Sequence, residues 1–254
     1  MSARIAVITG AGSGIGRATA IALSKKGTRV VLNGRNIAKL EKVRAAIGEM
    51  SGCIIVPGDV ADSAVPAACM NAGREAWGEW PDIFIASAGK GMPGTVTNSD
   101  PALWDELIDT NIKGLMHQLR AVAGQMLQLA GDGRDFVMSP LDIVVIGSTI
   151  GRNVSPFNSV YGATKFAAHG LTEALRRQLG PQGIRVSLLE PGLVKTDFQK
   201  TAGYDLEWFE GYAREVGPVL TAEDVANVIA FLVDLPGNVH LDNISIRPTR
   251  QAYP

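Results

Sequence analysis

The segment Thr9–Gly16, TGAGSGIG, decides the fold of this chain. It stands between an apolar run, Arg4–Ile8, that predicts a buried β-strand and a helical pattern, Ile15–Lys26, that ends before Gly27. Glycines at such a turn let the backbone approach a phosphate group, and the helix N-terminus adds partial positive charge. The alternative is a tight turn that only packs the helix on the strand. We expect nucleotide binding here, through Gly10, Ser13, Gly14, Ile15 and Gly16.

Strand-like and helix-like segments alternate along the rest of the chain, which predicts an α/β fold with a parallel sheet covered by helices on both faces. The predicted later strands are Arg29–Asn33, Cys53–Pro57, Asp82–Ala86, Leu141–Ile146, Ile184–Leu189 and Asn243–Ile246. The predicted later helices are Ile37–Ile47, one from a Ser63 cap to Trp77, Pro101–Leu129 behind an Asp100 cap, Val160–Leu179 with Asn158 or Ser159 as cap, and one opened by a Thr221–Asp224 capping box. No linker interrupts the pattern, so residues 1–254 are expected to form a single domain.

Composition restricts the classes of function. The chain has 254 residues, of which 46% are hydrophobic, and a net charge of −1. Without a basic excess, a nucleic-acid partner or an acidic membrane surface is not expected. No apolar run approaches the roughly 20 residues of a membrane span, and the chain enters a strand too early for a signal peptide. We therefore expect a cytoplasmic protein with a small-molecule substrate.

A second informative segment is Ser148–Lys165, STIGRNVSPFNSVYGATK. Ser148 follows the predicted strand Leu141–Ile146, whereas Tyr161 and Lys165 are four residues apart on the next helix and share one face. An ammonium fixed beside a phenol lowers the pKa of the phenol, which would let Tyr161 exchange a proton near neutral pH. The alternative is an ordinary surface pair.

The candidate residues share one position in the predicted sheet, directly after the carboxyl end of a strand. Ligands of open α/β sheets bind in the crevice at this edge. Unrelated residues would be scattered over both edges, so we expect one ligand site. Its predicted members are the glycine turn, Arg35, Asp59 with Val60, the ASAG segment with Ala88 and Gly89, Ser148, and Pro191 with Gly192.

The turn after the second strand, Asn33–Asn36, predicts the cofactor. Sites for NAD place an acidic residue here for the ribose 2′-hydroxyl, whereas sites for NADP place an arginine for the 2′-phosphate. This turn has no acid and contains Arg35, so NADP(H) is expected rather than NAD(H). Asn33 and Asn36 are weaker candidate contacts, and the alternative for Arg35 is a solvated side chain.

Taken together, these motifs resemble the short-chain dehydrogenase/reductase family in its single-domain branch. The resemblance covers nearly the whole chain and rests on TGAGSGIG, Asp59, ASAG, Asn111, Ser148, YGATK from Tyr161 to Lys165, and PGLVKT from Pro191. It implies a Rossmann-like doubly wound sheet of order 3-2-1-4-5-6-7, and hydride transfer between NAD(P) and an alcohol or carbonyl. It also implies a homotetramer, built on the two long helices and the last strand.

The resemblance also implies roles for four catalytic residues. Tyr161 gives a proton to the carbonyl oxygen during reduction, Ser148 orients that oxygen, and Lys165 holds the nicotinamide ribose. Asn111, placed within a helix that it is expected to interrupt, keeps a water that links Lys165 to solvent. Thr196 is expected to contact the nicotinamide carboxamide.

Two positions depart from the family pattern. ASAG stands where the family usually has NNAG, so two amide side chains are missing. Ser13 stands where some NADP enzymes carry a basic residue, which leaves Arg35, helped by Arg17, to bind the 2′-phosphate.

Substrate contacts are expected from residues 90–94, 151–157 and 193–217. The last segment is rich in aromatic side chains and predicts a lid; its alternative is a helical pair on the core or a subunit contact. Arg152 is a candidate partner for a substrate carboxylate. The C-terminal HLDNISIRPTRQ, residues 240–251, resembles family members that act on 3-hydroxy acids and related polar alcohols.

Two other functions remain open at this point. One is a nucleotide-sensing regulator that keeps the fold without catalysis; the other is a nucleotide-sugar epimerase or dehydratase of the family's longer branch. The filled catalytic positions favour an enzyme over the first, and the chain length disfavours the second. No metal site is expected, because His117, His169 and His240 lack ligand spacing and are interpreted as structural.

Overall fold

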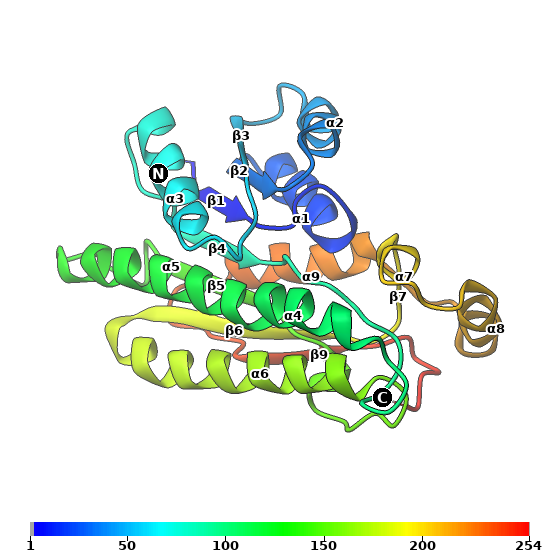
Figure 1. The fold of residues 1–254 in the computed structure, drawn as a ribbon. Helices are drawn as coiled ribbons and strands as arrows, with labels where there is room; N and C mark the ends of the chain where they lie inside the picture. Colours follow the sequence, from blue (N-terminus) through cyan, green and yellow to red (C-terminus); the bar gives the residue numbers. More distant parts are fainter. Residues whose placement is uncertain (1–2, 254) are drawn as a thin grey trace.

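The computed structural model describes residues 3–253, whose centre is a seven-stranded sheet of order β3-β2-β1-β4-β5-β6-β9 (Figure 1). All neighbouring strands in it are parallel, and β1 lies between β2 and β4, with Ile8 beside Leu32 and Ile85. The predicted strand order is therefore confirmed. The strands are β1 Ile5–Ile8, β2 Arg29–Gly34, β3 Cys53–Pro57, β4 Ile83–Ala86, β5 Leu141–Ile146, β6 Ile184–Pro191 and β9 Asn243–Ile246.

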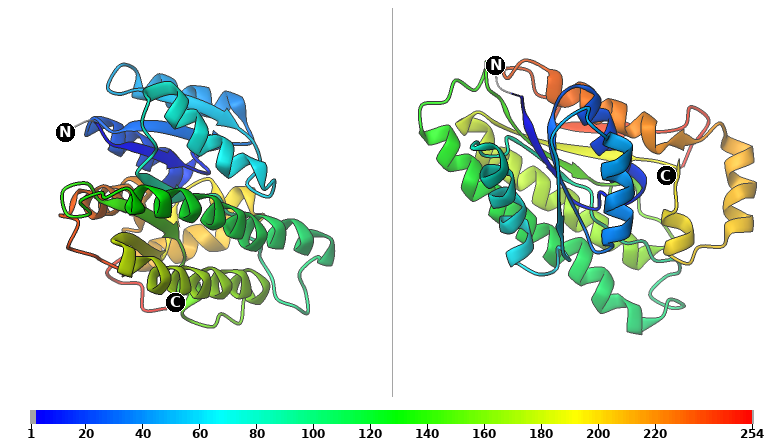
Figure 2. Two further views of the ribbon diagram at one scale, coloured as in Figure 1. Left: turned by 90° about the vertical axis from the view of Figure 1, so that its left-hand side faces the viewer. Right: turned by 90° about the horizontal axis from the view of Figure 1, so that it is seen from above.

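Helices cover both faces of the sheet. The helices α1 (Gly14–Lys25), α2 (Ile37–Ile47) and α9 (Ala222–Asp234) pack on one face. The opposite face carries α3 (Ala64–Trp77), α5 (Gly114–Gly131) and α6 (Ser159–Leu179), as the two turned views show (Figure 2). Among residues 3–253, no helix is long and apolar enough to cross a bilayer.

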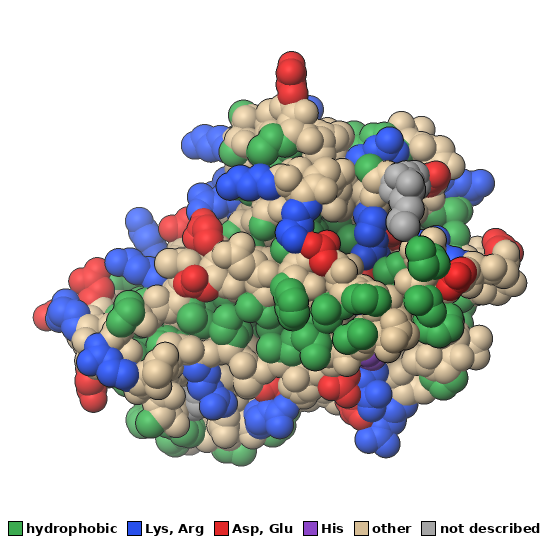
Figure 3. Space-filling model, turned by 180° about the vertical axis from the view of Figure 1, so that it is seen from behind, with side chains coloured by type: hydrophobic (Ala, Val, Ile, Leu, Met, Phe, Trp, Pro, Cys, Tyr) green, Lys and Arg blue, Asp and Glu red, His purple; other side chains and the backbone are tan. Residues whose placement is uncertain are grey.

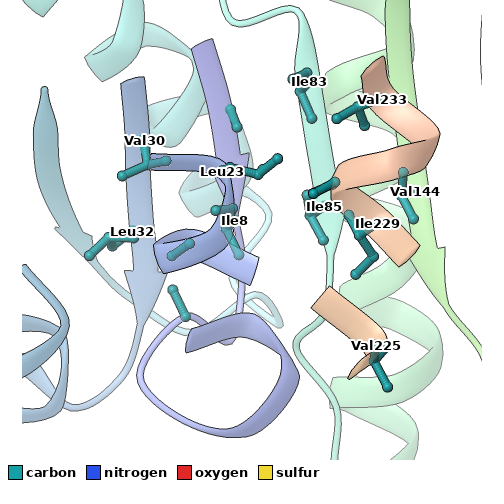
Figure 4. Close-up of a cluster of buried hydrophobic side chains, with 14 of the residues drawn as sticks. Ile8, Leu23, Val30, Leu32, Ile83, Ile85, Val144, Val225, Ile229 and Val233 are labelled. Carbon is teal, nitrogen blue, oxygen red and sulfur yellow. The ribbon is translucent and has the colours of Figure 1, made fainter. Parts of the chain in front are cut away.

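Each face of the sheet has its own hydrophobic core. Under α1 and α9, Ile85 lies beside Ile229, and Ile8, Leu32 and Val225 belong to the same cluster of fully buried side chains (Figure 4). Burying one such side chain contributes about 1.5–3 kcal/mol. Because strands covered on both faces need apolar residues at every position, β1 and β4 are continuous apolar runs rather than alternating patterns.

Buried charges tie the strands together at their amino-terminal edge. The Arg185 guanidinium donates two hydrogen bonds to the Asp142 carboxylate, at 2.7 and 2.9 Å. Arg4 donates to Asp142 at 2.8 Å and to Asp82 at 3.0 Å. These ion pairs join the amino-terminal ends of β1, β4, β5 and β6. The carboxyl-terminal edge of the sheet is not occupied by them and can bind ligands.

The long helix predicted for Pro101–Leu129 is broken into four pieces. A 3₁₀ turn, Pro101–Leu103, with Asp100 accepting from the Ala102 N–H, leads into α4, Trp104–Ile108. A π-helical turn at Asp109–Lys113 then precedes α5. The prediction that Asn111 interrupts the helix is therefore confirmed.

Helix caps were predicted with mixed success. Thr221 and Asp224 form the expected capping box at the start of α9. The caps expected from Ser63 and Asn158 are wrong, since neither side chain bonds to the first turn of its helix. The Ser159 hydroxyl accepts instead from the Val96 N–H, in another loop.

The segment expected to be an irregular lid is partly helical. A short strand, β7 (Val194–Lys195), pairs with β8 (Leu220–Thr221), and two helices, α7 (Phe198–Thr201) and α8 (Leu206–Val216), lie between them. This helical pair lies at the end of the molecule toward which the sheet strands point (Figure 1). This segment therefore lies beside the predicted ligand edge.

Candidate active site

A cleft of about 230 Å³ opens at the carboxyl-terminal edge of the sheet. Its lining joins the glycine turn, the ends of β2, β3 and β4, and α7, so the segments predicted to share one edge do share it. Seven predicted cofactor residues line it: Gly10, Ser13, Arg35, Asp59, Val60, Ala88 and Gly89. Gly14, Ile15, Gly16, Pro191, Gly192 and Thr196 do not line it, although Thr196 approaches a Cβ built on Gly14 to 3.6 Å.

The glycine turn has no room for side chains at two positions. Gly10 has φ +64°, and a Cβ there would be 2.9 Å from the Ala88 Cα. A Cβ on Gly16 would be 2.5 Å from the Gly10 carbonyl oxygen. The turn is therefore wedged between α1 and the segment after β4, and its backbone lies open to the cleft as phosphate binding requires.

The backbone of the ASAG segment is fixed by hydrogen bonds to the Thr9 side chain. The Thr9 hydroxyl accepts hydrogen bonds from the Ser87 and Ala88 N–H groups, each at 3.1 Å, and donates to the Gln118 side chain at 2.8 Å. The missing amide side chains of this segment are therefore not needed to fix its backbone beside the cleft.

Charged side chains gather where the cleft passes the end of β2. Arg35, Lys39 and Lys90 line it. Arg35 lies 3.4 Å from both the Asp59 and the Glu106 carboxylates, and Lys90 also pairs with Glu106. The cations exceed the acids by one, so this part of the cleft attracts an anion.

The expected helper of Arg35 was misplaced. Arg17 is not part of the lining and lies 3.9 Å from Glu223 on α9. Lys39 lines the cleft with Arg35 instead. The sequence analysis did not assign Lys39 to the site, although a lysine in the first turn of the helix after Arg35 could have indicated it. The two weaker candidates, Asn33 and Asn36, do line the cleft; Asn33 also donates to the Val56 carbonyl, and Asn36 caps α2.

Ser148, Tyr161 and Lys165 come together as predicted. The side chains of Ser148 and Tyr161 are hydrogen-bonded to each other. The Lys165 Nζ lies 5.9 Å from the centre of the Tyr161 ring and donates to the Ile146 carbonyl at 3.0 Å. The end of β5 and one face of α6 therefore present all three side chains to one point.

The prediction that Lys165 lowers the pKa of Tyr161 is wrong. Burial raises the pKa of Tyr161 above its ordinary value, the nearby Tyr204 raises it further, and only the Ser148 hydrogen bond lowers it. Burial also lowers the pKa of Lys165 to about 8. Desolvation disfavours the charged form of each group, so Tyr161 is a neutral phenol, the form that can donate a proton.

Asn111 is committed to the backbone of the ASAG loop. Its side chain accepts from the Lys90 N–H and donates to the Lys90 carbonyl, both at 2.8 Å, and it lies 3.1 Å from the Thr164 hydroxyl. A Cβ on Gly89 would be 3.5 Å from the Asn111 Oδ1 and 3.9 Å from the Lys165 Nζ. Asn111 thus fixes the cleft wall nearest to Lys165.

The assignment of Arg152 to a substrate carboxylate is wrong. Its guanidinium donates to both oxygens of Glu190, at 2.9 and 2.7 Å, and the Glu190 side chain is fully buried. His169 also faces this carboxylate and accepts from the Ser148 N–H at 3.3 Å. The sequence analysis did not assign Glu190 or His169 to the site. Two features could have indicated them: Glu190 is an acid at the end of an apolar strand, and His169 follows Lys165 by four residues on the same helix.

Aromatic side chains of the lid segment cover Tyr161. The ring centre of Phe198 lies 6.1 Å from that of Tyr161 and 6.4 Å from that of Tyr204. The Tyr204 hydroxyl donates to the Met92 carbonyl at 3.2 Å and lies 3.5 Å from the Asn158 Nδ2. Within residues 3–253, the buried Asn158 Oδ1 has no hydrogen-bond partner.

Comparison with known proteins places the chain in a family. Residues 4–207 match the family described as short chain dehydrogenase. The chain belongs to this family. An uncharacterized oxidoreductase of Staphylococcus aureus (strain MW2) is 32% identical over 245 residues, which are 96% of this chain and 97% of that protein. A Staphylococcus epidermidis relative, also an uncharacterized oxidoreductase, is 31% identical over the same length. The chain is an NAD(P)-dependent oxidoreductase, and a regulator without catalysis is not supported.

Solved structures of the family have the same fold. The closed form of a serine dehydrogenase complexed with NADP+ has a TM-score of 0.87 and 28% identity, covering 98% of this chain and 96% of its own. The 3-ketoacyl-(acyl-carrier-protein) reductase of Brucella melitensis, complexed with NADH, has a TM-score of 0.84, 26% identity and coverage of 97% and 98%. Levodione reductase has a TM-score of 0.85, 27% identity and coverage of 98% of each chain. Neighbours therefore bind either form of the cofactor.

Proposed function

We propose that the chain is an NADP(H)-dependent oxidoreductase that transfers a hydride between nicotinamide and a small carbonyl or alcohol, with a 3-hydroxy acid or a related polar alcohol as substrate. The observation that carries the proposal is the convergence of Ser148, Tyr161 and Lys165 at the sheet edge that also holds the nucleotide cleft. The bound cofactor supplies the hydride, and the protein supplies position and proton transfer.

NADP(H) is the proposed form because the cleft presents Arg35, Lys39 and Lys90 near the end of β2. Asp59 accepts a hydrogen bond from Arg35 there, but this acid follows the third strand, whereas the acid of an NAD site follows the second. A 2′-phosphate at this point replaces a carboxylate as the partner of Arg35 and gains charge-assisted hydrogen bonds. The wedged glycine turn is proposed to hold the pyrophosphate, with Thr196 beside it.

The proposed mechanism gives each catalytic side chain one task. In carbonyl reduction, the neutral Tyr161 phenol donates its proton to the substrate oxygen as that oxygen gains charge. Ser148 hydrogen-bonds the same oxygen and holds it near Tyr161. Lys165 holds the nicotinamide ribose, and Asn111 fixes the loop that lines the cleft beside Lys165.

Substrate and assembly follow the family likeness. The serine dehydrogenase among the structural neighbours is named for serine, which is itself a 3-hydroxy acid. We propose that residues 1–254 act as one domain, with residues 193–217 as a lid whose Phe198 must leave Tyr161 to admit substrate. We also propose a homotetramer, supported by exposed Met116 and Leu127 on α5, Phe166 on α6 and Phe231 on α9. The face on which α9 lies carries a band of hydrophobic side chains (Figure 3).

The proposal is tested by following NADPH oxidation at 340 nm against a panel of small carbonyls, and NADP reduction against 3-hydroxy acids and simple alcohols. Wild type should turn over at least one group, with higher kcat/KM for NADPH than for NADH, and Tyr161→Phe should abolish turnover while binding NADPH normally. Turnover that survives in Tyr161→Phe would show that the proton donor is another group. Higher efficiency with NADH would refute the cofactor assignment.

A further inference from the structure

We propose that His169 is a positioning residue for Ser148, and that loss of its acceptor lone pair in acid lowers the rate of the reaction. This inference rests on the proposed function of Ser148, Tyr161 and Lys165. His169 touches neither the cleft nor the reacting atoms. It would act through the backbone of the turn after β5.

The imidazole of His169 is fitted under the Ser148 turn. The Ser148 N–H donates to its Nε2 at 3.3 Å. A Cβ built on Gly147 would be 2.5 Å from Nε2, and one on Gly151 would be 2.4 Å from the same atom. The turn therefore packs on the ring at Gly147, Ser148 and Gly151, and both glycines are needed to let the ring approach.

The contacts of His169 fix its tautomer. Because Nε2 accepts a hydrogen bond, it carries a lone pair, and the proton of the neutral ring is on Nδ1. Nδ1 lies 3.7 Å from a carboxylate oxygen of Glu190. The Nδ1–H thus faces a negative charge, so this ring orientation places each nitrogen against a group of complementary polarity.

Glu190 is held as a carboxylate although it is fully buried. Burial raises the pKa of Glu190, but hydrogen bonds from Arg152 and Ser245 outweigh it, and the pKa lies below its usual value. The Ser245 hydroxyl on β9 donates at 3.0 Å, and Arg152 closes the other side of the carboxylate. The support behind His169 is therefore rigid and charged.

This arrangement connects the parts of the proposed site. His169 follows Tyr161 by eight residues and Lys165 by four, so all three lie on one face of α6. Glu190 directly precedes Pro191 and Gly192 on β6. One imidazole thus sets the distance between the Ser148 turn and the helix that carries the proton donor, and a shift of this turn moves the Ser148 hydroxyl away from Tyr161.

Protonation of His169 removes the support. A proton on Nε2 would point at the Ser148 N–H, so the hydrogen bond is lost and two donors face each other. Burial lowers the pKa of His169 below its ordinary value; Glu190 raises it, whereas Lys165 and Arg152 lower it. The rate is therefore expected to be intact at neutral pH and to fall in acid, below the ordinary histidine pKa of about 6.5.

Two substitutions separate the acceptor from the bulk of the ring. His169→Gln keeps a carbonyl oxygen that can accept from Ser148 but does not titrate, whereas His169→Phe keeps an aromatic ring without an acceptor. Because a misplacement of about 1 Å can cost about 100-fold in rate, we expect His169→Phe to lose about tenfold in kcat with little change in KM for NADPH. His169→Gln should stay within a few-fold of wild type and lack the fall in kcat/KM between pH 6.5 and 5 that wild type shows.

A double-mutant cycle decides whether His169 acts through Ser148. In a Ser148→Ala background, His169→Phe should cost no further activity, because the hydroxyl that it positions is already absent. The same loss in both backgrounds, or an acid fall in His169→Gln equal to that of wild type, would overturn the inference. His240→Gln is the matched control: it removes another partly buried histidine, whose ring lies 3.1 Å from the Val186 carbonyl rather than under the Ser148 turn, and it should keep the wild-type pH profile.

The two proposals fail differently. Absence of NADPH-dependent turnover in wild type, or its survival in Tyr161→Phe, would refute the proposed function. Turnover that requires Tyr161 but is indifferent to both His169 substitutions would refute only the role of His169. If His169→Phe does not fold, the pH profile of His169→Gln still decides, since it needs only the conservative variant.

Discussion

Gly16 is a position in the proposed cofactor site at which the structure predicts a large effect from a single added methyl group. In Gly16→Ala the new Cβ would be built 2.5 Å from the Gly10 carbonyl oxygen and 2.8 Å from its carbon, whereas real Cβ atoms essentially never come closer than 3.0 Å. The contact must therefore open by at least 0.5 Å, from 2.5 to 3.0 Å. Gly10 cannot retreat freely, because its α-carbon already lies against Ala88.

The cost of this shift can be divided between stability and cofactor binding. Overpacking of this kind costs about 1–3 kcal/mol of unfolding free energy, and each kcal/mol corresponds to about 2–4 °C in Tm for a chain of this size. The displaced backbone belongs to the proposed phosphate contacts, whose charge-assisted hydrogen bonds contribute about 1.5–3 kcal/mol each. Loss of one such bond weakens NADPH binding by about 10- to 100-fold.

The assay compares Gly16→Ala with Gly124→Ala by thermal unfolding and by fluorescence titration with NADPH. Gly124 lies in α5, and a Cβ there meets nothing within 4 Å. That alanine should stabilise the helix by about 0.5–1 kcal/mol and leave NADPH binding unchanged. A Gly16→Ala protein with wild-type Tm and wild-type affinity for NADPH would refute the reasoning, since the turn would then accommodate the methyl group without moving.

Three other perturbations test separate parts of the structure. Arg35→Ala should raise KM for NADPH about tenfold or more and KM for NADH much less, measured at 340 nm; equal changes would exclude a phosphate contact. Arg185→Met should lower the unfolding free energy in urea by about 3–5 kcal/mol, because the buried Asp142 keeps only Arg4 as a cationic partner and the Leu235 and Val239 carbonyls lose their donor; a loss below about 1 kcal/mol would contradict this. NADPH-dependent reduction should decline as pH rises past about 8, since the pKa of Lys165 is lowered to about 8, while the raised pKa of Tyr161 keeps the phenol protonated; an unchanged rate at pH 9.5 would argue against a charged lysine.

The same lowered pKa has a consequence for stability with a definite sign. Between pH 8 and the ordinary lysine pKa of about 10.4, the unfolded chain binds more protons at Lys165 than the folded chain does. The contribution of this group to the unfolding free energy therefore rises with pH across that window. Activity and this contribution change in opposite directions there, so a decline in rate cannot be attributed to unfolding caused by Lys165.

The elements of the fold could be predicted because they depend on local patterns. Continuous apolar runs mark strands covered on both faces, and spacing of four places Tyr161 and Lys165 on one side of α6. The break at Asn111 was also predictable, because asparagine has a low helix propensity. Such features are properties of neighbouring residues and need no knowledge of distant contacts.

The partners of individual charges could not be predicted in the same way. Arg152 stands close to Ser148 in sequence, but its partner Glu190 comes from another strand 38 residues away. Arg17 and Lys39 both carry a positive charge, and only the direction of α1 and α2 decides which one lines the cleft. The pKa of Tyr161 was misjudged for a related reason: charge proximity can be inferred from spacing, but the extent of burial is known only after the lid segment has been placed.

The two ends of the proposed site differ in solvent exposure, and this difference determines how salt should affect cofactor discrimination and kcat. At the end of β2, the Arg35 side chain is 56% exposed and pairs with two exposed carboxylates, those of Asp59 and Glu106. A phosphate can replace these carboxylates at a low cost in free energy. Around Ser148, by contrast, Glu190 is fully buried and Tyr161 is 7% exposed. Buried polar groups cannot be rearranged without large penalties. Salt should therefore weaken discrimination between NADPH and NADH, which depends on the exposed end, before it affects kcat, which depends on the buried one. If kcat fell with salt while the ratio of the two cofactors' kcat/KM stayed constant, this division of the site would be wrong.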